Sequence, residues 1–190
     1  MDNDYFSVEA ILGENQKIQC TFKQEIPNMG HLAGGTDRDI AVLSKVPIPM
    51  WLAYIVIYSD WADFNIPPPY ALKVRNALNA EATSVRLSNL VGQDGMWYGF
   101  GKMIMDMLSE QQGTDISNMM TNAFKARVVE IVDQAQNFAA LSHGDAGGRG
   151  GDVNLFRQGL DITERELFVA AQESSKRIKA WYEESNRIRQ

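Results

Sequence analysis

The most concentrated run of hydrophobic residues in the chain is MWLAYIVIY, at Met50–Tyr58, and it follows two closely spaced prolines, Pro47 and Pro49. Proline at the first helical position loses no hydrogen bond, so Pro49 favours a helix start. The β-branched and aromatic residues 54–58 favour a strand instead, and periodicity cannot decide for so short a run. We predict a buried helix here. It is too short for a membrane span, which needs about 20 apolar residues.

Before this run, two short segments alternate apolar and polar residues. They are residues 5–11 (YFSVEAI) and Lys17–Phe22 (KIQCTF), with a turn signal at Gly13 between them. Such alternation is typical of half-buried strands, so the pattern predicts a β-hairpin. Residues 27–35 (PNMGHLAGG) predict an irregular connection. Because a two-stranded hairpin is marginally stable alone, it must pack against the helical part or against another chain.

After the run, apolar residues recur at helical spacing. A helix stop at residues 65–69 (NIPPP) precedes three predicted helices, over residues 70–91, 96–108 and 115–138. Gly113 is expected to break the chain before the third of these, and Asp115 to cap it. A last helix is expected to begin at residues 161–163, where Thr163 and Glu166 have capping-box spacing.

Five glycines lie within residues 142–152 (SHGDAGGRGGD) and predict a flexible loop before the last helix. The predicted protein is therefore mainly α. A small β-containing N-terminal domain over residues 1–44 is expected to precede a helical-bundle body of about five helices over residues 45–190.

The length, hydrophobic content and net charge of the chain limit the classes of function that it can have. A chain of 190 residues with 45% hydrophobic residues can bury a sizeable core. Its net charge of −6 disfavours a broad basic surface for non-specific nucleic-acid binding. The basic C-terminal residues are interleaved with glutamates, which is typical of a solvated helix face. A single cysteine excludes an internal disulfide framework and favours a reducing compartment, and the first residues show no secretory signal.

Residues that could bind a metal are few and scattered. The histidines, His31 and His143, and Cys20 show none of the spacings of metal-binding motifs. Glu130 and Asp133 share a predicted helix face, but no histidine is close to them in sequence, so we interpret them as solvent-facing carboxylates. We therefore predict no metal and no cofactor.

No catalytic motif is complete in this sequence either. Cys20 is in phase with Ile18 and Phe22, which predicts a buried and inert thiol. In WYGFGKM, Gly101 precedes Lys102, but methionines replace the first Walker glycine and the magnesium-binding serine or threonine. We expect no catalytic residue.

Several strings, in order along the chain, resemble the third Psf subunit of the eukaryotic GINS replication complex. They are YFSVEAIL (5–12), KIQCTF with EIPNMGHL (17–32), IPMWLA (48–53), WYGFG (97–101) and LDITERELF (160–168). In the third string, Met50 stands where that family usually has leucine. The strings span nearly the whole chain, and residues 139–153 are the part that the resemblance supports least.

The resemblance implies a small β domain followed by a helical domain, in a non-enzymatic scaffold subunit located in the nucleus. Such subunits form a heterotetramer with three relatives, the Sld-five-type, Psf-one-type and Psf-two-type chains. The tetramer joins the Mcm hexamer and Cdc45 in the replicative helicase for initiation and elongation of DNA replication. The resemblance thus implies indirect contact with DNA and no association with a membrane.

Large apolar side chains are candidates for contact with those partners. Met103 and Met105 lie out of phase with the apolar stripe of their predicted helix, and methionine adapts well to partner surfaces. Aromatic residues are common interface anchors. We predict partner contact for Tyr98, Met103, Met105, Trp181 and Tyr182.

Two other functions stay open from the sequence. The chain could be a stand-alone helical adaptor that binds one partner helix through its methionine-rich face. It could also be a small helical enzyme that uses backbone amides and carboxylates. Expression of the chain alone and with the three relatives separates both from the scaffold.

Overall fold

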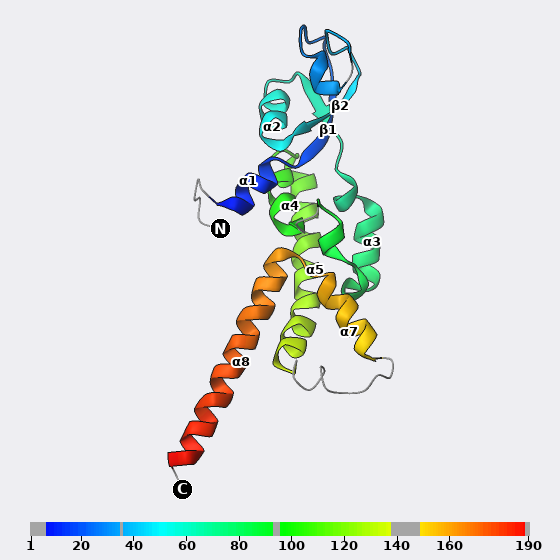
Figure 1. The fold of residues 1–190 in the computed structure, drawn as a ribbon. Helices are drawn as coiled ribbons and strands as arrows, with labels where there is room; N and C mark the ends of the chain where they lie inside the picture. Colours follow the sequence, from blue (N-terminus) through cyan, green and yellow to red (C-terminus); the bar gives the residue numbers. More distant parts are fainter. Residues whose placement is uncertain (1–6, 35, 93–95, 138–148, 189–190) are drawn as a thin grey trace. The chain divides into compact units, whose positions relative to one another are not determined.

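Helices make up most of the structure, and a small sheet lies in the N-terminal part, which confirms the predicted fold class (Figure 1). The computed structural model describes residues 7–34, 36–92, 96–137 and 149–188. The chain forms two compact units. Unit 1 comprises Met1–Val74 and Gly99–Ile116, and unit 2 comprises Arg75–Tyr98 and Ser117–Gln190.

Unit 1 is built on a three-stranded antiparallel sheet. The central strand β1 (Lys17–Phe22) pairs on one side with β2 (Lys45–Pro49) and on the other with β3 (Ala62–Phe64). Cys20 is buried in the middle of β1, as its phase predicts, and burial raises the pKa of its thiol to about 11. The predicted division into residues 1–44 and 45–190 stays a prediction. Strand β1 comes before the predicted boundary at residue 44, whereas β2 and β3 come after it, and all three strands pair in one sheet.

The first predicted strand is wrong, because residues 8–14 form the helix α1 (Val8–Glu14). Ser7 caps this helix: the backbone N–H of Ala10 donates to Ser7 Oγ at 3.4 Å. At the other end, the N–H of Asn15 donates to the carbonyl of Ile11. An alternation of three apolar residues fits either structure, and the serine cap favours the helix.

The hydrophobic run forms the helix α2 (Met50–Tyr58), so the predicted helix is confirmed. Pro49 is the residue before the helix instead of its first residue, and it ends strand β2. Burial differs from the prediction. Met50, Ala53 and Val56 are buried, whereas most of the remaining large side chains of α2 are exposed.

The connection between β1 and β2 is irregular, as predicted, and contains the 3-10 helix η1 (Gly30–Ala33). It is closed by backbone pairing between Ile26 and Ile40, and the N–H of Gly30 donates to the carbonyl of Arg38 at 3.0 Å. Asn28 adopts a left-handed φ of 61° and accepts a hydrogen bond from Arg38 Nε through its side-chain oxygen.

The helix predicted over residues 70–91 is shorter than expected. Residues 68–70 form η2 (Pro68–Tyr70), α3 covers Leu72–Ala80, and two 3-10 turns follow, η3 (Ala82–Ser84) and η4 (Leu87–Asn89). The carbonyls of Ala82 and Val85 accept hydrogen bonds from Arg127. These tertiary bonds compete with the continuation of the helix.

Four helices complete the described chain: α4 (Trp97–Met105), α5 (Glu110–Gln136), α7 (Arg149–Gln158) and α8 (Ile162–Ile188). The predicted break at Gly113 is wrong, because α5 runs through it, and a single glycine costs only about 1 kcal/mol in a helix. Of the predicted loop over residues 142–152, residues 149–152 belong to α7, and the rest lies outside the described residues.

The core of unit 2 lies between α5, α7 and α8. Ile131 and Ala135 of α5 pack with Phe156 of α7, Leu160 after it, and Phe168 of α8. Among the described residues, no helix is long and apolar enough to cross a membrane.

Candidate partner interface

Unit 2 is organised around a buried ion pair between Arg127 of α5 and Glu164 of α8, each 0% exposed. The pairing is bidentate, with 2.7 Å from Arg127 Nε to Glu164 Oε1 and 2.9 Å from Nη2 to Oε2. The guanidinium also donates from Nη1 to the carbonyls of Ala82 and Val85, at 2.6 and 2.9 Å. Such a charge is tolerated inside a protein because its donors are satisfied.

Asp161 connects the start of α8 to the start of α4. Its Oδ1 accepts from the N–H of Thr163 at 2.9 Å, and its Oδ2 accepts from the N–H of Trp97 at 2.6 Å. In return, the N–H of Asp161 donates to Glu164 Oε2 at 3.1 Å. This is a capping box of Asp161 and Glu164, two residues before the predicted pair.

Tyr98, a predicted interface residue, contributes to the same buried centre. Its hydroxyl donates to Glu164 Oε1 at 2.9 Å, and its ring lies edge-on to Phe124. Burial and the Glu164 carboxylate raise the pKa of Tyr98, so the hydroxyl keeps its proton and donates. The side chain is half-buried. Its contact with a partner stays a prediction.

In unit 1, α2 presents an exposed aromatic surface, which we call the α2 outer face: Trp51, Tyr54, Ile55 and Tyr58. Trp51 is 50% exposed and Tyr58 is 85% exposed. The rings of Tyr54 and Tyr58 are stacked, with centroids 6.4 Å apart. A helix that is apolar on all sides is normally covered on all sides. Within the described part of the chain, α2 buries only the side that contains Ala53.

Met103 lies beside the α2 outer face. It lines a cavity of about 280 Å³ together with Trp51 and Tyr54. The remaining lining side chains are Glu14, Met50, Asp106 and Met107. Met105, two residues further along α4, is half-buried.

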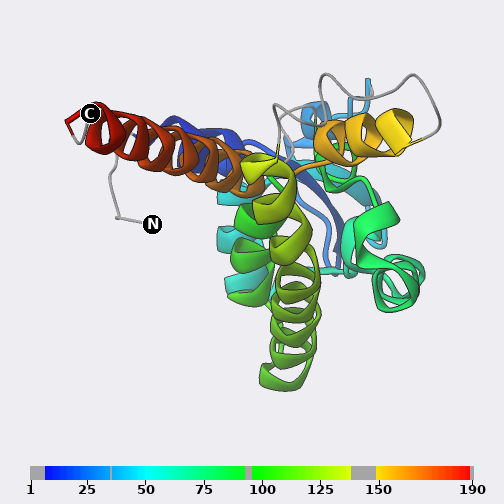
Figure 2. The same ribbon diagram turned by 90° about the horizontal axis from the view of Figure 1, so that it is seen from below.

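The last turns of α8 form the second exposed surface, and we call residues 176–182 the α8 distal segment. Every residue in it is exposed, Trp181 by 62% and Tyr182 by 59%, and these two rings meet edge-on with centroids 4.9 Å apart. Figures 1 and 2 both show the C-terminal half of α8 extending away from α5 and α7 within unit 2. The distal segment thus offers aromatic surface on a regular helix.

In the described part of the chain, no three His, Cys, Asp or Glu side chains are grouped so that they could hold a metal ion. Glu130 accepts a hydrogen bond from Gln134 of the next turn, and Asp133 accepts one from Asn137. These two carboxylates are thus engaged with amide side chains of their own helix.

Comparison with known proteins gives the family. Residues 6–58 match the family described as "PSF3 N-terminal domain", and residues 70–183, more than half of the chain, match "GINS complex protein helical bundle domain". The chain belongs to the PSF3 family of GINS subunits. The second matched region includes the Arg127–Glu164 pair, and the first ends with α2.

Two fungal PSF3 relatives match over almost their whole length. "DNA replication complex GINS protein PSF3" of Phaeosphaeria nodorum is 35% identical over 94% of this chain and 96% of its own. The Aspergillus fumigatus protein of the same description is 31% identical over 96% of this chain and 98% of its own. A more distant relative in Dictyostelium discoideum, described as probable PSF3, is 26% identical, and the match covers 93% of this chain and 61% of its own length.

The PSF3-type strings of the sequence include the residues that hold unit 2 together. LDITERELF contains both Asp161 and Glu164, and WYGFG contains Trp97 and Tyr98. Sequence reasoning missed Arg127, although a signal was present. Arg127 is three residues from Phe124 and four from Ile131, so it occupies a core position of an otherwise apolar helix face.

Asp161 should give the chain an unusual pH dependence. Its burial, together with nearby Glu164, raises the pKa of Asp161 to about 6, although its backbone hydrogen bonds oppose the rise. The folded state therefore binds this proton more tightly than the unfolded state, so Asp161 adds stability as the pH falls from about 6 towards 4. We expect Asp161→Asn to remove that gain, which is at most about 3 kcal/mol because one pKa unit is about 1.4 kcal/mol.

The measurement is the unfolding free energy of the chain and of Asp161→Asn from pH 7 to pH 4, with the difference plotted against pH. Asp133→Asn, at an exposed aspartate on α5, is measured in parallel as the control for the loss of a carboxylate. A flat difference for Asp161→Asn would mean that its carboxyl titrates alike in both states.

Proposed function

We propose that the chain is a non-enzymatic scaffold subunit of the GINS complex in DNA replication. Membership of the PSF3 family supports this function, and so does the α2 outer face, an aromatic surface of a kind that a lone chain does not usually leave uncovered. The Sld-five-type, Psf-one-type and Psf-two-type chains are its proposed partners in a heterotetramer. The tetramer is in turn proposed to join the Mcm hexamer and Cdc45 in the nucleus, with DNA contacted only indirectly.

The proposed contact residues belong to three places. Met103 and its neighbour Met105 lie on α4, with Met103 beside the α2 outer face. Trp181 and Tyr182 anchor the α8 distal segment, and Tyr98 offers the exposed part of its ring. In such an arrangement the chain supplies shape and anchors, while the motor subunits of the helicase supply the chemistry.

Co-expression tests the assembly. The chain alone is expected to be poorly soluble, and with the three partner chains it should form a complex of equal stoichiometry, measured by size-exclusion chromatography with light scattering. A soluble, monodisperse monomer that ignores all three partners would contradict the scaffold and favour the adaptor.

The α2 outer face should be the more sensitive of the two exposed surfaces. We expect the double variant Trp51→Ser with Tyr58→Ser to weaken assembly by at least about 100-fold, because truncating a central aromatic anchor typically costs about 2 kcal/mol or more. Binding is measured by titrating the purified partner subunits against each variant at constant salt.

A matched control lies on α5. Val129 is apolar and exposed like the anchors but lies outside both surfaces, so Val129→Ser should leave assembly within about threefold of the unaltered chain. Circular dichroism spectra of all variants should show the same helix content, which separates the loss of a contact from the loss of the fold. Undisturbed assembly of the double variant would show that partners do not cover α2.

A further inference from the structure

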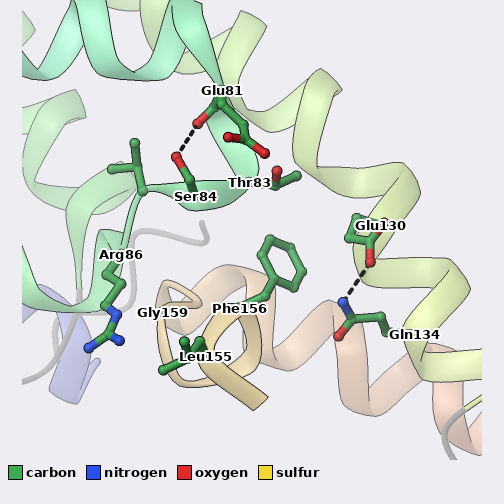
Figure 3. Close-up of a pocket in the computed structure, with 10 residues that line it drawn as sticks. Glu81, Thr83, Ser84, Arg86, Glu130, Gln134, Leu155, Phe156 and Gly159 are labelled. Atoms are coloured by element: carbon green, nitrogen blue, oxygen red, sulfur yellow. Dashed lines mark hydrogen bonds between the residues drawn. The ribbon is translucent and has the colours of Figure 1, made fainter. Parts of the chain in front are cut away.

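Unit 2 contains a cavity that the two exposed surfaces do not include (Figure 3). It lies between the turns after α3, the C-terminal end of α5 and the end of α7, and its volume is about 550 Å³. This is within the usual range of ligand sites, about 300–1,000 Å³. Its lining includes Glu81, Glu130, Gln134, Leu155 and Phe156.

Gln134 places an unsatisfied acceptor at this cavity. The residue is only 3% exposed, and its Nε2 donates to Glu130 Oε1 at 2.6 Å. An ionised carboxylate only accepts hydrogen bonds, so the amide must turn its NH₂ group to Glu130 and its oxygen away. That oxygen, Oε1, has no donor among the described residues. A buried carbonyl without a donor is destabilising, so the site favours a ligand that supplies an N–H.

The charged side chains that line the cavity favour a cationic ligand. Carboxylates line it on two sides, Glu81 after α3 and Glu130 on α5. Arg86 is exposed and lies on the opposite side from Glu130 in Figure 3. The Arg127 guanidinium lies 4.9 Å from the Phe156 ring, but Glu164 neutralises its charge. Among the described residues that line the cavity there are thus two carboxylates and one cationic side chain; Glu81 and Arg86 are both exposed, and Glu130 is half-buried.

The walls between these acceptors are apolar. Phe156 is buried, whereas Leu155 is 44% exposed. Long basic side chains bury their methylene stems along such surfaces and place the charged end on acceptors. A guanidinium carries five N–H donors in a planar fork, so one group can serve a carboxylate and an amide oxygen at once, which a compact ammonium does less well.

We propose that this cavity receives the arginine side chain of a partner polypeptide. Its guanidinium donates to Gln134 Oε1 and to the carboxylates of Glu130 and Glu81, and its stem packs against Leu155 and Phe156. Only the source of the arginine, a protein partner, rests on the proposed scaffold function. The chemistry of the cavity does not.

The test uses the full-length chain and two small probes, Nα-acetyl-arginine amide and Nα-acetyl-citrulline amide. Citrulline has nearly the shape of arginine without its charge. At equal ionic strength, the arginine probe is expected to raise the melting temperature in a saturable way, followed by tryptophan fluorescence, and the citrulline probe is not. Equal effects of the two probes would overturn the proposal, and so would equal binding of Nα-acetyl-lysine amide.

Variants locate the effect. Gln134→Leu should abolish the arginine-dependent shift, and Glu130→Gln should weaken probe binding about tenfold or more. Without a probe, Gln134→Leu should melt at the same or a higher temperature than the unaltered chain, because it removes an unsatisfied buried oxygen. Gln136→Leu, an exposed glutamine on the same helix, should leave the shift intact. If the shift survives in Gln134→Leu, the proposed site is wrong.

A final comparison separates the source of the arginine from the site itself. In the complex assembled with the three GINS partners, a partner arginine fills the cavity, so the free arginine probe should lose at least about tenfold in apparent affinity. Unchanged probe binding in the assembled complex would overturn the partner arginine. If assembly fails but the isolated chain still discriminates arginine from citrulline, the scaffold function is contradicted and the cavity assignment holds.

Discussion

Replacing Glu164 by glutamine is expected to lower the unfolding free energy of the chain by about 3–5 kcal/mol. The substitution keeps the shape of the side chain but removes its charge, which leaves the buried Arg127 guanidinium without compensation. It also replaces one of the two carboxylate oxygens by an NH₂ group, so either the hydrogen bond from Tyr98 to Oε1 or the one from the backbone N–H of Asp161 to Oε2 is lost. Urea unfolding followed by fluorescence measures the loss, because Trp97 of unit 2 is fully buried.

The same helix offers a control for charge alone. Glu173 forms an exposed ion pair with Arg177 at 3.5 Å, so Glu173→Gln should change stability by less than about 0.5 kcal/mol. Equal effects of Glu164→Gln and Glu173→Gln would contradict the role of the buried pair.

Removing both charges of the buried pair tests the cause of the loss. The double variant Arg127→Met with Glu164→Leu leaves no uncompensated charge, so it should be more stable than Glu164→Gln alone. It should recover only part of the loss, because the carbonyls of Ala82 and Val85 would still lack the donor that Arg127 supplies. The same urea titration measures both variants.

Gly30→Ala is expected to be the second most damaging single substitution, at about 3 kcal/mol, the upper end of the usual cost of overpacking. A Cβ atom at residue 30 would collide with the carbonyl oxygen of Asp37 and lie only 2.6 Å from its carbonyl carbon. Both are backbone atoms, so no side chain can rotate away. The N–H of Gly30 also donates to the carbonyl of Arg38, which keeps the two segments close.

A second glycine in the same connection separates collision from backbone strain. Gly34 has a left-handed φ of 76°, but a Cβ there would meet nothing within 4 Å among the described residues. Gly34→Ala should therefore cost only about 1 kcal/mol, the usual penalty of a left-handed alanine. Both variants are measured by chemical unfolding of the full chain. If Gly30→Ala were the milder of the two, the close approach to Asp37 would not be what requires glycine.

Sequence patterns predicted the elements that local chemistry decides. The apolar stripe of α4, the start of α8 and the phase of β1 were all visible in the periodicity of the chain. The predicted secondary structure was wrong where one contact, or a contact between residues distant in sequence, determines the conformation. The Ser7 cap makes α1 a helix, and Arg127 draws the carbonyls of Ala82 and Val85 away from α3. Neither contact leaves a periodic trace.

The candidate surfaces divide in the same way. Trp181 and Tyr182 were predicted as contact residues because aromatic side chains are common interface anchors, and both are exposed. The hydrophobic run was predicted to be buried. The structure shows instead that no side chain or backbone in the described part of the chain covers the α2 outer face. The cavity with Gln134 also could not be predicted, since its lining comes from three segments that are far apart in the sequence.

The two prolines of β2 also limit how a partner can attach to the sheet. The N–H of Met50 donates to the carbonyl of Gln16, and the carbonyl of Ser44 accepts from the N–H of Phe22. The N–H and C=O groups of the even-numbered residues of β2 therefore point towards β1. Pro47 and Pro49 therefore point to the outer edge, where they have no N–H to offer. An additional strand could not form a regular ladder there. Recognition along this edge of unit 1 must rely on side chains, and unpaired extended peptides find no template for aggregation along β2.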